Sequence, residues 1–151
     1  MNIGIVVPHT GSSQISFYAI KEINSLIENG YKHDVILFFE HLISPIIKPL
    51  CGMMCINELM SFRGILINTT IDNTIMACAR TCDINNQIIF YVWNLEWMRR
   101  EKNIYLYNYN AFKNAHKLIA RSENHAKAIE NYSNRKVDKI LAEFNVEEII
   151  K

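Results

Sequence analysis

Residues 87–100 read QIIFYVWNLEWMRR, and this stretch decides the fold. Its first part, residues 88–92, is a run of β-branched and aromatic side chains, the types that suit a buried strand. Its second part places two tryptophans, Trp93 and Trp97, around an amide and a carboxylate, Asn94 and Glu96. In open parallel α/β sheets, ligands bind at the carboxyl ends of the strands. We therefore expect part of any functional site at residues 93–97.

Similar apolar runs occur at residues 3–7, 35–39, 64–68 and 117–120, and residues 137–141 are a last strand candidate. The run at 35–39 does not alternate between apolar and polar side chains, which is typical of a strand covered on both faces. Segments long enough for a helix separate most of the runs, so right-handed crossovers are expected. The sequence predicts one α/β domain over residues 1–151, with a doubly wound, mainly parallel, Rossmann-like sheet.

The helices follow from apolar periodicity and from capping residues. A helix over residues 15–28 is predicted to be capped by Ser12, Ser13 or Ser16 and to end at Asn29 and Gly30. Further helices are expected at residues 73–82, with Thr70 or Asp72 as the cap, at 105–114, and at 123–132 after Ser122. Residues 41–59 contain two prolines and a glycine and are interpreted as a loop with a short helix. The last residues, from 144 onward, suit a short helix or a turn.

Composition and charge narrow the class of protein. Half of the 151 residues are hydrophobic and 21% are charged, a globular mixture. The formal net charge of +1 does not indicate nucleic acid or an anionic membrane as a partner. Every apolar run is far shorter than the roughly 20 residues of a membrane-spanning helix. Residues 1–7 lack the basic-then-apolar pattern of a signal peptide, so we expect a cytoplasmic protein with reduced cysteines.

The cysteines form two C-x₃-C pairs, Cys51 with Cys55 and Cys78 with Cys82. This spacing is allowed for zinc. However, the second pair lies among apolar residues of a predicted helix, where a free cysteine acts as a small hydrophobic side chain. The histidines are scattered and show no metal-binding spacing. We expect no bound metal, no disulfide and no cofactor.

Four segments together resemble a known family. They are IGIVVPHTGSS at residues 3–13, ENGYKHDV at 28–35, LIARSENHAKAIEN at 118–131 and VDKILAEFNVEEI at 137–149. Their arrangement of strands, small-residue loop and helix starts is similar to the N-terminal, acceptor-side half of a GT-B fold glycosyltransferase. The resemblance implies transfer of a sugar from a nucleotide-sugar donor to an acceptor hydroxyl. One departure is Asn145, which stands where the family usually has glycine.

In that family a C-terminal domain holds most of the donor, and its donor-site residues have no counterpart in this chain. The resemblance therefore implies a partner, either a second GT-B half or another copy in a homo-oligomer, before sugar transfer is expected. A second hypothesis is a non-catalytic binding or structural module with the same fold. A third is a small nucleotide-binding regulator.

Four loops at the carboxyl edge of the predicted sheet supply the candidate site. Glu96 is the candidate general base, since sugar transfer needs a group that takes the proton of the acceptor hydroxyl. The alternative is that Glu96 caps a helix or pairs with Arg99 or Arg100 while the tryptophans pack. The candidate ligand-binding residues are His9, Thr10, Gly11, Ser12, Ser13, Thr69, Thr70, Trp93, Asn94, Trp97, Arg121 and Ser122. We expect these loops to line one cleft, with Trp93 or Trp97 as an aromatic wall.

Overall fold

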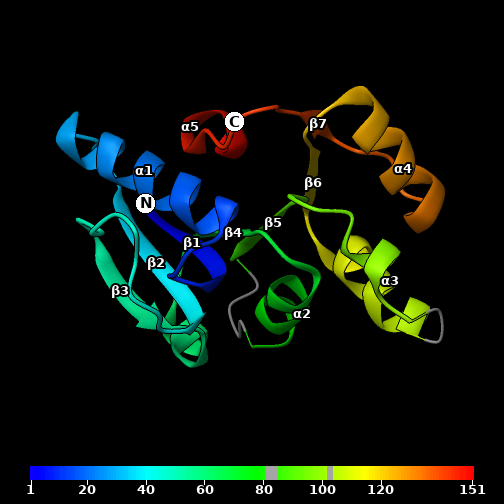
Figure 1. Ribbon diagram of the computed structural model, residues 1–151, viewed down its shortest axis with the longest axis horizontal. Helices are drawn as coiled ribbons and strands as arrows, with labels where there is room; N and C mark the ends of the chain where they lie inside the picture. The colour runs from blue at the N-terminus through cyan, green and yellow to red at the C-terminus, as the bar shows by residue number, and fades with distance from the viewer. Residues whose placement is uncertain (81–84, 102–103) are drawn as a thin grey trace.

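The computed structural model describes residues 1–80, 85–101 and 104–151 (Figure 1). The strands are β1 Asn2–His9, β2 Asp34–His41, β3 Gly52–Cys55, β4 Ile65–Asn68, β5 Gln87–Tyr91, β6 Lys117–Ala120 and β7 Lys139–Ile140. The α-helices are α1 Gln14–Glu28, α2 Ile71–Arg80, α3 Tyr105–Asn114, α4 Glu123–Ser133 and α5 Val146–Ile150. Two 3₁₀ helices, η1 Ile56–Ser61 and η2 Glu96–Arg99, complete the described elements.

All strands pair in parallel in one sheet with the order β3-β2-β1-β4-β5-β6-β7. The predicted doubly wound α/β fold is therefore confirmed. The chain moves outward from β1 through β2 to β3 and then returns to β4 on the other side of β1. The strand order thus reverses between β1 and β4, and β5 lies between β4 and β6 with both edges paired.

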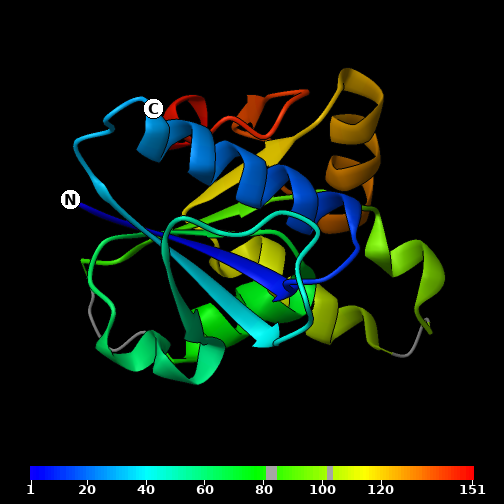
Figure 2. The same ribbon diagram turned by 60° about the vertical axis from the view of Figure 1, so that its left-hand side comes forward.

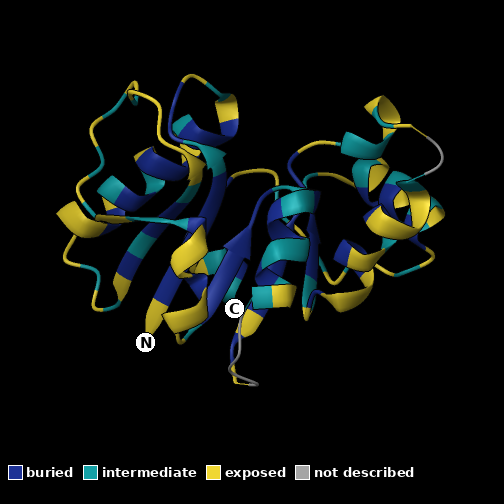
Figure 3. Ribbon diagram, turned by 90° about the horizontal axis from the view of Figure 1, so that it is seen from below, coloured by how far each residue is buried: buried dark blue, intermediate teal, exposed yellow. Residues whose placement is uncertain are grey.

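Helices cover both faces of the sheet (Figures 1 and 2). On one face, α1 and α5 pack on the strands, as contacts of Ile20 and Ile149 with the cluster around Ile5 show. On the other face, η1 packs on the strands β1, β2 and β4, while α3 and α4 pack on β5 and β6 through Phe112 and Ile129. The inner strands β1, β4, β5 and β6 are correspondingly the most buried part of the chain, whereas the edge strands β3 and β7 are not buried (Figure 3). Burial on both faces explains why the apolar runs do not alternate.

The predicted capping residues are confirmed at three helix ends. The side-chain oxygen of Ser13 accepts the backbone N–H of Ser16 at 3.1 Å, and that of Ser122 accepts the N–H of His125 at 3.2 Å. Gly30, just after α1, has a φ of 71°, the left-handed conformation that glycine adopts without steric cost. These caps set the places where α1 and α4 leave the carboxyl edge of the sheet.

One segment was predicted incompletely. Residues 41–59 were expected to form a loop with a short helix, but they also contain the edge strand β3. This strand has four residues, follows a proline-containing loop and pairs with β2 alone, so it lacks the long apolar run of a central strand. At the other edge, β7 is reduced to Lys139–Ile140. The predicted end of the helix over 73–82 lies outside the described residues.

The described cysteines, Cys51, Cys55 and Cys78, are free thiols, and Cys82 lies outside the described residues. Cys51 packs against the hydrophobic cluster beneath α1, whereas Cys55 packs against the cluster beside η1. Within residues 1–80, 85–101 and 104–151, no group of three or more His, Cys, Asp or Glu side chains is arranged to hold a metal ion. In the same ranges, no helix has the length and apolar character required to cross a membrane.

The packing of Gly4 gives a test of the central sheet. A Cβ atom built on Gly4 lies 2.6 Å from Cδ2 of the buried Leu66 and 3.0 Å from the ring of Phe38, whereas one on Gly52 meets nothing within 4 Å. We expect Gly4→Ala to lower the free energy of unfolding by about 1 to 3 kcal/mol through overpacking. Gly52→Ala, the matched control on the edge strand, should leave it unchanged or slightly raised. Urea unfolding of both variants measures this, and equal stabilities would contradict the packing of β1 against β2 and β4.

Candidate functional site

A groove runs along α1 on the face of the sheet that this helix covers. One wall is the side of α1 that carries Gln14, Tyr18 and Glu22, whose spacing of four residues places them on one face of the helix. The other wall is the segment after β7, with Glu143 and Phe144. The cavity has a volume of about 360 Å³, a size suited to a small ligand. Its full lining, termed the α1 groove, is Gln14, Tyr18, Lys21, Glu22, Ser25, Trp93, Arg121, Ala142, Glu143 and Phe144.

A second cavity of about 450 Å³ adjoins the α1 groove at the carboxyl ends of β5 and β6. It is lined by Trp93, Asn94, Leu95, Arg121, Ser122, His125 and Ala142, and is termed the Arg121 hollow. The groove and the hollow share Trp93, Arg121 and Ala142, so they form one continuous depression. Both strands end here because their apolar runs give way to polar residues, as the sequence pattern indicated.

Aromatic side chains form the wall between these cavities. The ring of Trp93 lies 5.7 Å from that of Tyr18 and 6.1 Å from that of Tyr91, measured between centroids. The guanidinium carbon of Arg121 lies 3.9 Å from the Trp93 ring centroid, a cation–π contact. Trp93 is only 5% exposed, whereas Tyr18 is 42% exposed. Tyr18 therefore offers the larger aromatic surface to a ligand.

Two hydrogen bonds fix the outer wall of the α1 groove. The hydroxyl of Tyr91 donates to the carbonyl of Leu141 at 2.9 Å, and the backbone N–H of Val146 donates to Oε1 of Glu22 at 3.0 Å. Burial raises the pKa of Tyr91 to about 12, so its hydroxyl keeps its proton at neutral pH. The segment between these two anchors carries Glu143 and Phe144 into the groove.

His125 lines the Arg121 hollow as a neutral imidazole. Burial, and then the charge of Arg121, lowers the pKa of His125 below its ordinary value. Its Nδ1 atom accepts the backbone N–H of Arg121 at 3.3 Å. This contact assigns the proton of the neutral ring to Nε2, which makes His125 a hydrogen-bond donor on its other side.

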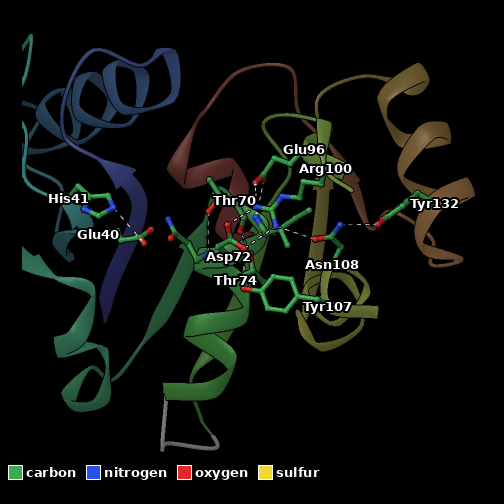
Figure 4. A network of polar contacts seen from close by, with 12 residues as sticks. Glu40, His41, Thr70, Asp72, Thr74, Glu96, Arg100, Tyr107, Asn108 and Tyr132 are labelled. Atoms are coloured by element: carbon green, nitrogen blue, oxygen red, sulfur yellow. Dashed lines mark hydrogen bonds and ion pairs between the residues drawn. The ribbon is translucent and has the colours of Figure 1, made fainter. Parts of the chain in front are cut away.

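Glu96 belongs to a polar network between α2, η2 and α3 (Figure 4). Its Oε1 atom accepts the backbone N–H of Ile71 at the start of α2, at 2.9 Å. Its Oε2 atom lies 3.3 Å from Arg100, and Arg100 also forms a two-pronged contact with Asp72 at 3.0 and 2.6 Å. Glu96 therefore caps α2 and joins it to η2, and its ion-pair partner is Arg100 rather than Arg99.

The environment of Glu96 changes its acidity strongly. Burial raises the pKa of Glu96 to about 7, and the Ile71 N–H and Arg100 offset only part of this effect. The Arg100 guanidinium holds the pKa of Asp72 below its usual range. Glu96 also lines a cavity of about 370 Å³ with Asn94, Leu95, Met98 and Arg99, which shares Asn94 and Leu95 with the Arg121 hollow. A carboxyl group that titrates near neutrality thus lies next to the hollow.

Of the predicted ligand-binding residues, Trp93, Asn94, Arg121 and Ser122 line the depression together. Ser122 is also the cap of α4. The two cavities are lined by the loops after β5 and β6 and not by those after β1 and β4, so a ligand-binding role for the latter stays a prediction.

The predicted residues outside the depression have structural contacts. Thr10 is buried and bonded to the Ile43 backbone, the N–H of Gly11 donates to Nδ1 of His9, and Ser12 precedes the cap residue Ser13. The hydroxyl of Thr69 donates to the Val6 carbonyl, and Thr70 accepts the N–H of Asn73 at the start of α2. Trp97 stacks on Tyr132 with ring centroids 4.4 Å apart. Of the two tryptophans proposed as an aromatic wall, Trp93 alone lines the depression.

The residues that α1 and the segment after β7 contribute to the groove were not predicted from the sequence. Gln14, Tyr18 and Glu22 lie on the polar side of an amphipathic helix, which normally faces solvent. The signal that was present is Tyr18 itself, a large aromatic residue on that polar side. Nothing local in the sequence brings Glu143 to the same place, since that depends on the contact of α5 with α1.

Comparison of the chain with models of known protein families gave no match, and neither did comparison with curated proteins. The depression lies at the carboxyl edge of the strands, where ligands bind in parallel sheets, but beside β5 and β6 rather than at the strand-order reversal between β1 and β4.

Titration of Glu96 predicts how stability depends on pH. A carboxyl group whose pKa is raised in the folded state binds its proton more tightly there, so stability falls as pH rises from its unfolded value toward about 7. We expect Glu96 to account for a loss of about 1 to 3 kcal/mol between pH 5 and pH 8. Glu96→Gln keeps an oxygen for the Ile71 N–H and removes the titration.

Chemical unfolding of both proteins across this pH range checks the prediction, and subtracting one curve from the other cancels the contributions of His125 and Glu22. The difference in unfolding free energy should favour the variant increasingly up to pH 7 and then remain constant. A flat difference would show that Glu96 has an ordinary pKa.

Proposed function

We propose that this protein is the acceptor-side domain of a GT-B type glycosyltransferase and that the α1 groove holds a sugar of the acceptor. The observation that carries the proposal is the exposed Tyr18 ring in the groove, backed by Trp93 and faced by carboxylates from two segments. In this proposal, the donor and its diphosphate are held by a second GT-B half, supplied by a partner chain or another part of the assembly.

The chemistry of the α1 groove suits a sugar ring. A sugar presents C–H groups on its faces and hydroxyls at its edge, so it needs an aromatic surface together with hydrogen-bond partners around it. Tyr18 provides the aromatic surface, Glu22 and Glu143 provide acceptors, and Gln14 provides both a donor and an acceptor. Glu22 remains available through Oε2, because the Val146 N–H bonds to Oε1.

Glu96 is the carboxylate that we propose as proton acceptor for the transfer. A general base is most effective when its pKa lies near the working pH, and burial places that of Glu96 at about 7. Its cavity shares Asn94 and Leu95 with the Arg121 hollow, which connects it to the proposed sugar site. An acceptor long enough to extend from the α1 groove through the hollow would bring its hydroxyl to this carboxylate.

The contacts of Glu96 also favour a second candidate function, a non-catalytic binding module with the same groove. Both oxygens of Glu96 have partners within the protein, Ile71 and Arg100, as expected of a structural side chain. The two candidates differ in the presence of a partner that carries the donor site. Release of nucleoside diphosphate that depends on Glu96 in such a complex would favour the transferase.

Tyr18 provides the direct test of sugar binding. The chain contains two tryptophans, so Trp97→Phe leaves Trp93 as the only fluorescent indole, next to the proposed sugar. In this background we expect a member of a panel of glucose, galactose, mannose and N-acetylglucosamine to change Trp93 emission with saturation. Tyr18→Ala should weaken that sugar about tenfold by removing the stacking surface, whereas Tyr18→Phe should bind within about twofold of the parent.

Tyr105→Ala is the matched control, since Tyr105 on α3 is 40% exposed and lies outside the depression. It should not change the sugar affinity. If no sugar of the panel binds, or if Tyr105→Ala weakens binding as much as Tyr18→Ala, the α1 groove is not a sugar site.

A further inference from the structure

Arg121 differs from Arg100 and Arg135 in having no carboxylate partner among the described residues. Arg100 pairs with Asp72 and Glu96, and Arg135 pairs with Asp138. Within the part of the chain that the structure describes, no carboxylate forms an ion pair with Arg121, and its buried Nε–H has no acceptor. Its close neighbours are the Trp93 ring and the hydroxyl of Tyr91.

This arrangement is costly without a ligand. Arg121 is half-buried, and its Nε–H is fully buried without an acceptor. Leaving a buried donor unsatisfied costs about 1 to 3 kcal/mol. The contact with Trp93 recovers only about 0.5 to 2 kcal/mol. The same contact holds the planar group in a fixed position, so that an incoming anion does not have to order it. Arg121 is therefore a preorganised cation for which the described residues supply no anionic partner.

The Arg121 hollow surrounds this cation with further hydrogen-bond donors. Three residues of its lining carry such donors: the amide of Asn94, the hydroxyl of Ser122 and the Nε2–H of His125. The helix α4 begins at the same place, after Ser122, and the partial positive charge of its N-terminus favours an anion there. Among the described residues, no aspartate or glutamate lines this cavity. Glu22 and Glu143 line the adjoining α1 groove, which Arg121 also lines, but neither forms an ion pair with Arg121.

We propose that the Arg121 hollow binds a phosphate group, so that the ligand of this site is a phosphorylated sugar rather than a neutral one. This inference rests on the proposed function for the sugar part and extends it to the charge of the ligand. The sugar lies against Tyr18 with its hydroxyls toward Glu22 and Glu143. The phosphate lies beyond Trp93, where Arg121 presents its two-pronged guanidinium and Ser122 and His125 donate to the remaining oxygens.

Calorimetric titration separates the two parts of this ligand. The probes are glucose, galactose and mannose, their 6-phosphates, their uronic acids and inorganic phosphate. We expect at least one sugar phosphate to bind roughly tenfold to a hundredfold more tightly than its neutral parent. Arg121→Met should reduce that preference to within about twofold, because the phosphate contact is lost. The readout is the ratio of the two affinities measured in the same variant, since Arg121 also lines the α1 groove and its loss can change the affinity for the neutral sugar.

Lys127→Met is the matched control, since it removes one positive charge from an exposed position of α4 outside the depression. It should retain the full preference for the phosphate. Arg121→Lys keeps the positive charge but loses the two parallel N–H donors of the guanidinium, and should retain part of the preference for the phosphate. Circular dichroism and thermal unfolding of each variant establish that the fold is intact, and the Lys variant keeps the test decisive if the Met variant does not fold.

The possible results have distinct meanings. Equal affinity for a neutral sugar and its phosphate would overturn the phosphate site and leave the sugar groove intact. Tighter binding of a uronic acid than of the 6-phosphate would also overturn it, by assigning Arg121 to a carboxylate. Binding of phosphates that depends on Arg121 but is insensitive to Tyr18→Ala, with no binding of neutral sugars, would support the phosphate site and refute the sugar groove.

Discussion

The candidate site depends on the attachment of the segment 141–146 to the rest of the fold. Tyr91, fully buried at the end of β5, donates a hydrogen bond to the Leu141 carbonyl, and Glu22 on α1 accepts one from Val146. Between these anchors the chain turns over the end of the sheet and forms a wall opposite α1. Val146 and Ile149 then pack into the cluster beneath α1. Without this attachment, Tyr18 and Trp93 would lie on an open surface rather than in a groove.

The same end of β5 serves structure and chemistry through different residues. Trp93 and Asn94 turn toward the depression, whereas Glu96, Trp97 and Arg100 secure α2, α3 and α4 on the other side. Glu96 belongs to both groups, because it caps α2 and also lines a cavity next to the Arg121 hollow. The pKa of Glu96 is raised because its contacts with Ile71 and Arg100 do not fully compensate the carboxylate for its loss of hydration.

The fold could be predicted from the sequence to a large extent because its strands are buried on both faces. Continuous apolar runs such as 3–7 and 88–92 indicate buried strands. Ser13, Gly30 and Ser122 mark helix ends through residue preferences for capping positions. The strand β3 was missed because a short edge strand is little buried and therefore lacks a continuous apolar run. The site was predicted only where a strand ends, at Trp93, Asn94, Arg121 and Ser122. Tyr18 and Glu143 meet through contacts between residues as far apart as Glu22 and Val146, which local patterns do not reveal.

The central claim is that the ligand binds at the carboxyl ends of β5 and β6, beneath the segment 141–146, rather than where the strand order reverses between β1 and β4. The most direct measurement is a map of backbone amide shifts in ¹H–¹⁵N correlation spectra while glucose 6-phosphate is added. The account predicts that the shifts gather in residues 14–25, 93–95, 121–125 and 142–144. Shifts that gather instead at residues 9–13 and 69–70 would place the ligand at the strand-order reversal and contradict it.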